Sequence, residues 1–368
     1  MSKIRIGINL LPLFDTIAGA ERYAQSIVKA LAKIDRENEY ILFLNRYNKD
    51  YYKVEQDNFT NVVCDFPKNK IARVFYEQFA LPERIKNYKL DILFSTCNIA
   101  PLRAGCKLVT MMFDVHWLLL PQFFGNMKNF YIKKMLSATA EKSSKILTLS
   151  TCSKNDIVKL FGVSPEKVDV TFCGYMPEIN GHKTVKDDKY ILFVGQFHKR
   201  KNIPSLIRAF EVLKDKHAVE HKLYLAGRSG DGDTEILKLC AGSKYADDIK
   251  VTGYILDNDL TLLYNKADIF VYPSFYEGFG IPVIEAMAHK VPVACSNASS
   301  LPEVAGDGAL YFNPHNVSEI AEKIAVLAKD KKVREKLIEN GLRQVKKFTW
   351  EEVAVKTLEA FKEAAAQN

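Results

Sequence analysis

Residues 269–285, with the sequence IFVYPSFYEGFGIPVIE, decide the fold of this chain. The apolar run Ile269–Tyr272 predicts a short buried strand, and the helical pattern that follows is predicted to begin at Pro282, where a missing backbone N–H costs nothing. Gly278 and Gly280 lie between them, where they let the backbone approach a ligand closely. Because a helix start presents free N–H groups, this strand–turn–helix unit is predicted to bind an anion such as phosphate.

The same alternation of short apolar runs and longer helical patterns extends over the chain. Strands are predicted at residues 4–10, 40–44, 92–94, 108–112, 146–149 and 168–172, and again at 191–194, 223–226, 249–252, 269–272 and 291–294. Helices are predicted between them at 20–31, 71–85, 128–141, 155–160, 203–213, 258–266 and 282–288. This order is typical of an α/β protein with parallel sheets covered by helices on both sides.

A polar stretch at residues 178–189 interrupts the pattern and predicts two domains. We expect domains at residues 1–180 and 181–347, followed by a separate amphipathic helix in residues 348–368. Both domains are predicted to be doubly wound, or Rossmann-like, and to face each other across a cleft. Such sheets bind ligands at the carboxyl ends of their strands, so we expect the ligands in this cleft.

Two glutamates flank the glycines of the turn. Glu285 is expected in the first turn of the helix, where a carboxylate is electrostatically favoured and can accept hydrogen bonds from sugar hydroxyls. Glu277 lies on the loop before the helix and is expected to direct a second carboxylate into the same cleft. A plain turn with two solvated acids is the alternative interpretation.

The stretch 270–302 resembles the family 4 glycosyltransferases of the GT-B fold, which carry two glutamates in the spacing of Glu277 and Glu285. The resemblance covers nearly the whole chain and is most specific in its C-terminal half. It implies an acceptor-binding domain at 1–180, a donor-binding domain at 181–347, and a tail helix that returns to the first domain. It also implies that Glu285 holds the ribose of a nucleotide-sugar donor, and that Glu277 contacts the donor sugar or the leaving phosphate.

A basic segment follows the predicted strand at 191–194. Arg200 and Lys201 stand beside a helix start, where cations would stabilise a departing diphosphate. The family carries an Arg-Lys pair at this point, whereas an arginine that some members have directly after Gly195 is replaced here by Gln196. We expect Lys201→Ala to cut turnover by about two to three orders of magnitude, with little change in melting temperature.

Further site residues are implied by the resemblance. Gly19, in a loop that leads into the first helix, is expected to face the donor diphosphate, although the dinucleotide motif G-x-G-x-x-G is absent. The expected donor-binding residues are Gly19, Gly195, Gly227, Arg228, Tyr254, Ser274, Gly278, Phe279, Gly280, Ile281 and Glu285. The expected catalytic residues are Glu277, Lys201, Arg200, Asp114 and His116.

Asp114 and His116 follow the predicted strand at 108–112, at a strand end where ligands bind. Many relatives have a His-Asp pair here, but Phe113 occupies the histidine position of this chain. Two interpretations stay open: His116 turns towards the donor sugar, or Phe113 packs against the sugar while His116 faces solvent.

No cofactor and no metal are expected. Residues 231–233 (DGD) and 257–259 (DND) resemble the acidic metal-binding triplets of other glycosyltransferases, but aspartate in such turn-forming stretches commonly caps helices. The basic residues are expected to stabilise the leaving group instead.

The charge of the chain is uneven. The net charge is +8, and residues 1–180 contribute 25 Lys+Arg against 18 Asp+Glu. Basic and aromatic residues interleave at 68–89 and 128–145, which indicates either ordinary solvated helices or a face that rests on anionic lipid. With no apparent signal peptide or membrane span, we expect a cytoplasmic protein that is either soluble or peripheral on the inner face of the membrane.

The resemblance implies a retaining hexosyltransferase of surface polysaccharide assembly, with mannose from GDP-mannose as the leading donor. Its partners would be a nucleotide diphosphate sugar and a glycan or lipid-linked acceptor. A nucleotide-sugar epimerase of similar two-domain shape is the alternative. A non-catalytic nucleic-acid-binding protein fits less well, because Glu277 and Glu285 suit a phosphate backbone poorly, so no nucleic acid partner is expected.

Overall fold

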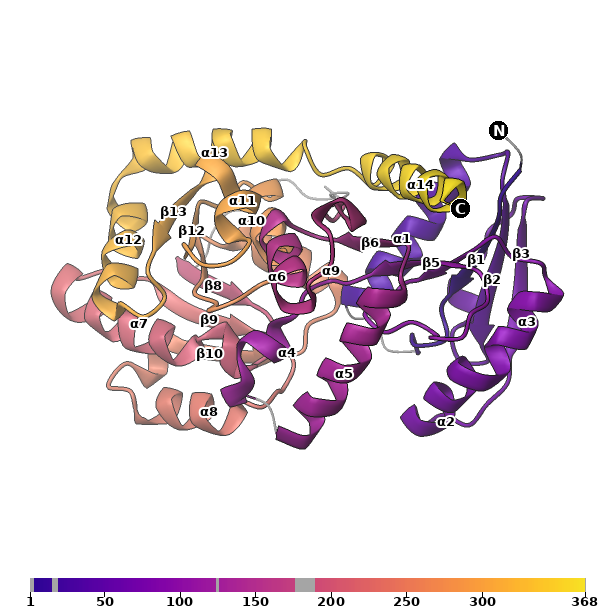
Figure 1. The fold of residues 1–368 in the computed structure, drawn as a ribbon. Coiled ribbons are helices and arrows are strands. Elements are labelled where there is room, and N and C mark those ends of the chain that lie inside the picture. Colours follow the sequence, from indigo (N-terminus) through magenta and orange to yellow (C-terminus); the bar gives the residue numbers. More distant parts are fainter. Residues whose placement is uncertain (1–2, 15–18, 124–125, 176–188, 368) are drawn as a thin grey trace. The chain divides into compact units, whose positions relative to one another are not determined.

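The computed structural model describes residues 3–14, 19–123, 126–175 and 189–367, and the chain divides into two compact units. Unit 1 comprises Met1–Gly174 and Thr349–Asn368, and unit 2 comprises Tyr175–Phe348 (Figure 1). The predicted boundary at residues 180 and 181 lies outside the described residues.

Unit 1 contains a parallel sheet with the strand order β3-β2-β1-β4-β5-β6-β7. Its strands are β1 (Arg5–Asn9), β2 (Glu39–Asn45), β3 (Phe59–Cys64), β4 (Ile92–Ser95), β5 (Lys107–Met111), β6 (Lys145–Thr148) and β7 (Val168–Val170). Its helices include α1 (Gly19–Ile34), α2 (Lys70–Phe75), α3 (Leu81–Asn87), α4 (His116–Leu119), α5 (Asn126–Lys142), α6 (Thr151–Phe161) and α14 (Trp350–Ala366).

Successive side chains of a strand point to opposite sides of the sheet, and in unit 1 helices bury both of these faces. Leu93 of β4 joins an apolar cluster with Leu81 and Ile85 of α3. Its neighbour Phe94 lies on the other face, where its ring contacts Phe361 of α14 with centroids 5.3 Å apart. The near-continuous apolar strands of the sequence are therefore explained by helices on both sides.

The helix α14 belongs to unit 1 although it follows unit 2 in the chain. It packs against α1, β4, β5 and β6. At its start the ring of Trp350 lies against Tyr23 of α1, with centroids 5.5 Å apart. A Cβ at Gly174 would come within 2.6 Å of Trp350, so this position accommodates only glycine without displacement.

Unit 2 contains a second parallel sheet, in the order β10-β9-β8-β11-β12-β13. Its strands are β8 (Tyr190–Val194), β9 (Lys222–Ala226), β10 (Ile249–Gly253), β11 (Ile269–Tyr272), β12 (Val293–Ser296) and β13 (Ala309–Phe312). Its helices are α7 (Ile203–His217), α8 (Asp233–Gly242), α9 (Asp257–Lys266), α10 (Ile281–Ala288), α11 (Leu301–Ala305), α12 (Val317–Lys329) and α13 (Lys331–Val345). The strand order reverses between β8 and β11, and ligands of such sheets bind at the carboxyl ends of the strands at this switch point.

The doubly wound α/β fold predicted from the sequence is confirmed. The edge strands β3 and β13 were not predicted from the sequence. The helix predicted at 71–85 is instead three segments, α2, a π-helical turn η2 (Tyr76–Ala80) and α3. Among the helices of the described residues, none is both long and apolar enough to cross a membrane.

Candidate active site

A short 3₁₀ helix, η5 (Lys199–Lys201), lies between the end of β8 and the start of α7, at the switch point of unit 2. It ends at Asn202 in the left-handed conformation (φ 56°), which asparagine tolerates better than most residues. The Asn202 side-chain amide donates to the carbonyl oxygens of Pro273 (3.2 Å) and Pro314 (2.7 Å), and the Phe275 N–H donates to the Arg200 carbonyl (2.8 Å). These bonds fix η5 against the loop that follows β11.

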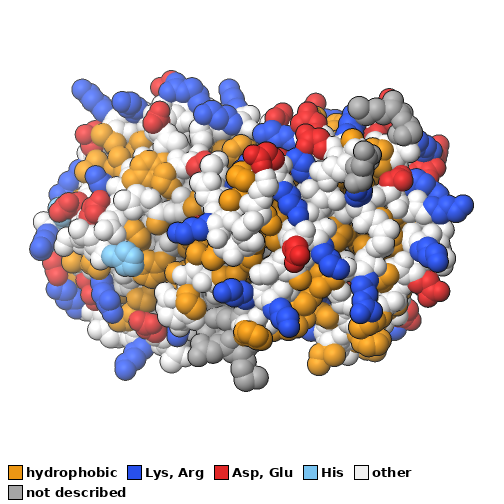
Figure 2. All heavy atoms as spheres, in the orientation of Figure 1, with side chains coloured by type: hydrophobic (Ala, Val, Ile, Leu, Met, Phe, Trp, Pro, Cys, Tyr) orange, Lys and Arg blue, Asp and Glu red, His pale blue; other side chains and the backbone are white. Residues whose placement is uncertain are grey.

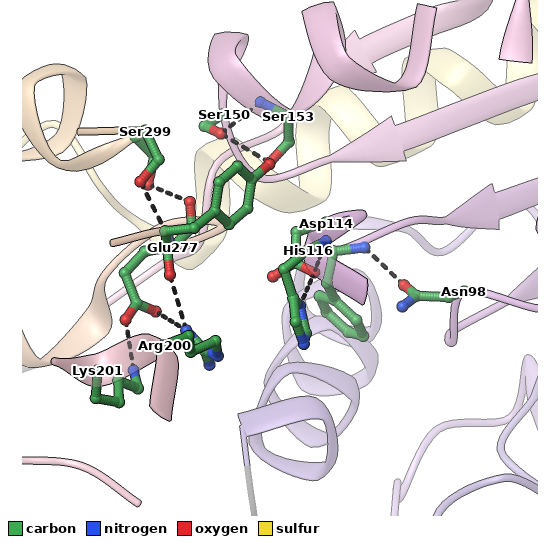
Figure 3. Close-up of polar contacts among 12 residues, drawn as sticks. Asn98, Asp114, His116, Ser150, Ser153, Arg200, Lys201, Glu277 and Ser299 are labelled. Carbon is green, nitrogen blue, oxygen red and sulfur yellow. Dashed lines mark hydrogen bonds and ion pairs between the residues drawn. The ribbon is translucent and has the colours of Figure 1, made fainter. Parts of the chain in front are cut away.

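Glu277, on that loop, forms a buried ion cluster with both predicted cations (Figure 3). Lys201 Nζ lies 2.6 Å from Glu277 Oε1, and Arg200 Nη1 lies 2.8 Å from Glu277 Oε2. Lys201 Nζ also donates to the hydroxyl of Tyr272, the last residue of β11. The structure thus brings together three of the residues that the sequence predicted as catalytic.

The electrostatics of this cluster keep Glu277 ionised. Burial by itself would raise the pKa of the carboxyl group, but the charges of Arg200 and Lys201 outweigh burial and lower the pKa to about 2. In this cluster two cations contact one carboxylate, an arrangement suited to an anionic ligand.

Two serines that the sequence analysis missed hold the Glu277 loop in place. Ser299, in the left-handed conformation (φ 54°), accepts a hydrogen bond from the Glu277 N–H at 2.8 Å. The buried Ser300 hydroxyl lies 2.9 Å from the carbonyl oxygens of both Glu277 and Phe279. The available signal was a run of small polar residues directly after β12, which is the neighbour of β11 in the sheet.

The glycine turn leads into α10 as predicted, with differences in detail. Gly280 adopts φ 103°, and a Cβ there would meet Leu301 at 2.6 Å, so the position requires glycine. The helix begins at Ile281 rather than at Pro282, and no side chain caps its start. Phe279 is buried with its ring against Phe348 (5.2 Å between centroids), so its backbone is the part suited to a ligand.

Glu285 lies in the second turn of α10, so its expected place in the first turn was wrong. Its Oε2 accepts a hydrogen bond from the hydroxyl of Tyr264 in α9 at 2.8 Å. The Tyr264 ring is buried and stacks on His289, with centroids 5.3 Å apart and planes 8° apart. Packing therefore restrains the orientation of the Glu285 carboxylate from the side of α9.

The ends of β8, β9 and β10 converge beside this cluster. The backbones at Gly195 and Gly227 are so close that a Cβ at Gly227 would lie within 1.9 Å of the Gly195 carbonyl oxygen. The guanidinium of Arg228 lies 4.1 Å from the ring centroid of Tyr254, whose side chain is 52% exposed. Tyr254 is therefore a surface ring backed by a cation rather than a core residue.

Ser274 is fully buried after β11, and its hydroxyl has no hydrogen-bond partner within the described part of the chain. An unpartnered buried hydroxyl is uncommon and suits a site that binds a polar ligand.

The first acidic triplet stabilises a loop. Asp231 accepts from the backbone N–H of Lys199 (3.0 Å) and contacts the His198 ring (2.9 Å), while Asp233 accepts from the Gly230 N–H (2.8 Å). The second triplet lies at the start of α9. Among the described residues, no group of three or more His, Cys, Asp or Glu side chains could hold a metal ion.

The predicted residues of unit 1 lie at carboxyl ends of its strands. Gly19 is the first residue of α1 and has open space around its Cα. Asp114 and His116 follow β5, and the Asp114 carboxylate Oδ1 lies 2.5 Å from His116 Nδ1 (Figure 3). The Phe113 ring packs edge-on against Tyr23 of α1, with centroids 5.3 Å apart. This contact orients Phe113 within unit 1.

Two doubly wound units in one chain are the architecture of the GT-B glycosyltransferases, the class to which the solved neighbours of this chain belong. The family model described as Glycosyltransferase Family 4 matches residues 17–178, and the model described as Glycosyl transferases group 1 matches residues 177–344. The chain therefore belongs to the family 4 glycosyltransferases of the GT-B fold.

Individual relatives agree with this assignment. O-antigen chain mannosyltransferase B of Escherichia coli is 34% identical, with 76% of each chain covered. O-antigen chain mannosyltransferase RfbU of Salmonella typhimurium is 28% identical, with 83% of this chain and 86% of the relative covered. The epimerase alternative is not favoured, because these relatives are named as sugar-transferring enzymes.

Among solved structures, a glycosyltransferase of Rickettsia africae superimposes with a TM-score of 0.73 at 19% identity and covers 100% of both chains. Anabaena HepE, solved in complex with UDP-glucose, gives a TM-score of 0.73 at 17% identity over 98% of this chain and 99% of its own. At these identities the likeness establishes the fold.

Proposed function

We propose that this glycosyltransferase transfers mannose from GDP-mannose to a glycan or lipid-linked acceptor in surface polysaccharide assembly, with retention at the anomeric carbon. The observation that carries the proposal is the 34% identity over three quarters of both chains to an enzyme named O-antigen chain mannosyltransferase B. The enzyme would work in the cytoplasm, at the inner face of the membrane.

In the proposed reaction, the bond between the anomeric carbon and the donor diphosphate breaks. The acceptor hydroxyl oxygen bonds to the same face of that carbon and passes its proton to the departing phosphate oxygen. The leaving diphosphate gains negative charge, which Arg200 and Lys201 are suited to stabilise because they form a preorganised cationic pair. Gly19 and the amides near Gly280 would add hydrogen bonds to the phosphates.

The remaining residues have separate proposed roles. Glu277, ionised and held by two cations, would position the donor sugar, and Glu285 would bind the ribose hydroxyls. Arg228 and Tyr254 would line the base and ribose pocket. His116, oriented by Asp114, would donate a hydrogen bond to the sugar or to developing charge.

No metal is required in this proposal, because the positive cluster takes the place that a divalent cation would otherwise have. Activity is then expected to persist in EDTA. Loss of activity in EDTA that manganese restores would contradict metal independence.

The proposal is tested by incubating the purified protein with GDP-mannose, other nucleotide sugars and a lipid-linked glycan acceptor. Product is expected only with GDP-mannose and acceptor together, with an α-linkage that preserves the donor configuration. Conversion of the donor without acceptor would indicate an epimerase. Product formed with a uridine diphosphate sugar and acceptor, but not with GDP-mannose and acceptor, would contradict the proposed donor.

A further inference from the structure

The surface of α2 and η2 exposes three large apolar side chains. Ile71 is 84% exposed, Phe75 is 64% exposed and Phe79 is 55% exposed. Figure 2 shows hydrophobic side chains gathered over this part of unit 1, with Lys and Arg side chains beside them. We call Ile71, Phe75 and Phe79 the apolar ridge. Contiguous exposed apolar side chains of this size mark a binding surface.

The backbone aligns the apolar ridge. A four-residue step turns slightly past one full turn in an α-helix, and the wider turn of the π-helix η2 offsets that drift between Phe75 and Phe79. The two rings lie 4.7 Å apart between centroids. π-helical turns are rare in proteins, and those that occur are frequently found at functional sites. The alignment of the ridge by such a turn therefore indicates a functional surface.

The opposite side of η2 is anchored to the sheet. Glu77 is buried there, accepts a hydrogen bond from Asn9 Nδ2 at the end of β1 (2.8 Å), and lies 3.5 Å from Arg73 Nε. The anchor directs Glu77 inward, so the ridge residues on either side of it remain outside. The apolar ridge is thus presented by a helix that the core holds in place.

Positive charge surrounds the ridge. Residues 65–89 contain six Lys or Arg and three Asp or Glu, and Glu77 is one of those three acids. Lys70 is exposed next to Ile71, and the exposed Arg103 places its guanidinium 5.6 Å from the Phe79 ring centroid. A shallow groove of about 1000 Å³ runs beside the ridge, lined in part by Phe66, Pro67 and Tyr76.

A second exposed aromatic pair lies on α5. Phe130 is 72% exposed and Tyr131 is 50% exposed, and the exposed Lys133 and Lys134 follow after Ile132. In Figure 1 α2 and the first turns of α5 both lie at the lower edge of unit 1.

We propose that the apolar ridge docks on an anionic phospholipid surface, with Ile71, Phe75 and Phe79 inserted at the boundary between headgroups and acyl chains. Apolar side chains flanked by cations have the composition of interfacial membrane helices, and lysine and arginine bind anionic headgroups. A second copy of this chain is a poorer occupant, because two positive surfaces would face each other. The inference rests on the proposed function in one respect, since it places the enzyme beside a lipid-linked acceptor.

The test compares co-sedimentation of the full chain with vesicles of phosphatidylcholine alone and of phosphatidylcholine with phosphatidylglycerol. We expect binding to the anionic vesicles that weakens as salt rises. The variant Ile71→Ser/Phe75→Ser/Phe79→Ser should bind them at least about tenfold more weakly. The control Leu237→Ser/Leu262→Ser removes comparably exposed side chains of unit 2 (51% and 49%) and should bind as the wild type does.

Circular dichroism and melting temperature verify that both variants are folded. Equal binding by the ridge variant and the wild type would overturn the proposal, as would equal binding to neutral and anionic vesicles. A wild-type dimer that the ridge variant alone dissociates would assign the ridge to a second copy instead. Vesicle binding needs no sugar transfer, so failure of the proposed donor would leave this result unaffected.

Discussion

Glu277 shows how a single residue can serve both stability and chemistry. Its carboxylate is buried yet ionised, which is tolerable only because Arg200 and Lys201 contact its two oxygens. The same cations are those proposed to stabilise the leaving diphosphate. Substitutions in this cluster are therefore expected to change both the fold and the reaction.

Lys201→Ala is expected to reduce kcat by about two to three orders of magnitude, because it removes a preorganised cation. The structure revises the expectation of an unchanged melting temperature. Lys201 is buried against Glu277, so its loss should also lower the free energy of unfolding by about 1–3 kcal/mol. Steady-state kinetics and urea unfolding measure the two effects. Lys216→Ala, at an exposed lysine of α7, is the control and should change neither. Wild-type turnover in folded Lys201→Ala protein would refute the assignment.

The ionisation of Glu277 makes stability depend on pH in a defined window. Its pKa is about 2 in the folded protein and 4.5 for an unperturbed glutamate, so ionised Glu277 stabilises the fold above about pH 4.5. That contribution, about 3 kcal/mol, is lost as the pH falls towards 2. The difference in unfolding free energy between wild type and Glu277→Gln should thus be constant near neutral pH and shrink in acid. A difference that ignores pH throughout would contradict the assigned ionisation.

At Asp114 and His116, the two interpretations left open by the sequence lead to opposite expectations for two variants. Phe113 packs on Tyr23, and Asp114 orients the His116 ring through Nδ1, as the proposed contact of His116 with the donor sugar requires. His116→Ala should lower kcat at least tenfold, equivalent to about 1.4 kcal/mol. Phe113→Ala should chiefly lower the melting temperature. Assays of both folded variants decide the matter, and full kcat in His116→Ala would remove that residue from the site.

At the scale of elements, the positioning of Glu285 depends on α9. Tyr264→Phe removes the hydrogen bond to the carboxylate but keeps the ring stacked on His289. We expect KM for the donor to rise about five- to tenfold, as the loss of about 1 kcal/mol from one typical hydrogen bond implies, with kcat less affected.

Tyr190→Phe is the matched control for Tyr264→Phe. Its hydroxyl donates to the Leu263 carbonyl of the same helix at 2.7 Å and does not contact Glu285. Equal changes of KM in both variants would show that α9 acts only through general stability. Calorimetric titration with GDP checks the binding effect independently of turnover.

The sequence predicted most central strands because they are buried on both faces and form continuous apolar runs. The edge strand β3 is different: its residues alternate between buried and exposed, and polar Thr60 and Asn61 interrupt the run. The π-helical turn was equally hidden, because its periodicity departs only slightly from that of an α-helix. Ser299 and Ser300 hydrogen-bond to the backbone of Glu277 on another loop, and a local sequence pattern does not encode such a contact between loops.

The site was predicted in part for the same reason. Glu277, Arg200 and Lys201 follow strands β11 and β8, and adjacent parallel strands bring their carboxyl ends together. Their direct ion pairing is set by side-chain geometry, which the sequence does not contain. The second-turn position of Glu285 differs from the prediction because α10 begins one residue earlier than Pro282.

At the scale of the whole molecule, unit 1 depends on α14. Phe361 is fully buried against Phe94, and Phe361→Ala should lower the unfolding free energy by about 3–5 kcal/mol. Both tryptophans of the chain, Trp117 and Trp350, belong to unit 1, so their fluorescence reports its unfolding in urea. Val355→Ala, at a 39% exposed position of the same helix, should be nearly silent. An unchanged tryptophan transition in Phe361→Ala would mean that α14 contributes little to unit 1.

The return of α14 also has a consequence for synthesis on the ribosome. Protein domains usually fold as they emerge, starting from the N-terminus. Here residues 349–368 complete unit 1, so every residue of unit 2 is translated before unit 1 has all its parts. In the nascent chain, Tyr23 and Phe94 therefore lack the contacts that they make in the finished protein with the rings of Trp350 and Phe361, respectively. The second unit in the chain can finish folding first, and the first unit closes after it.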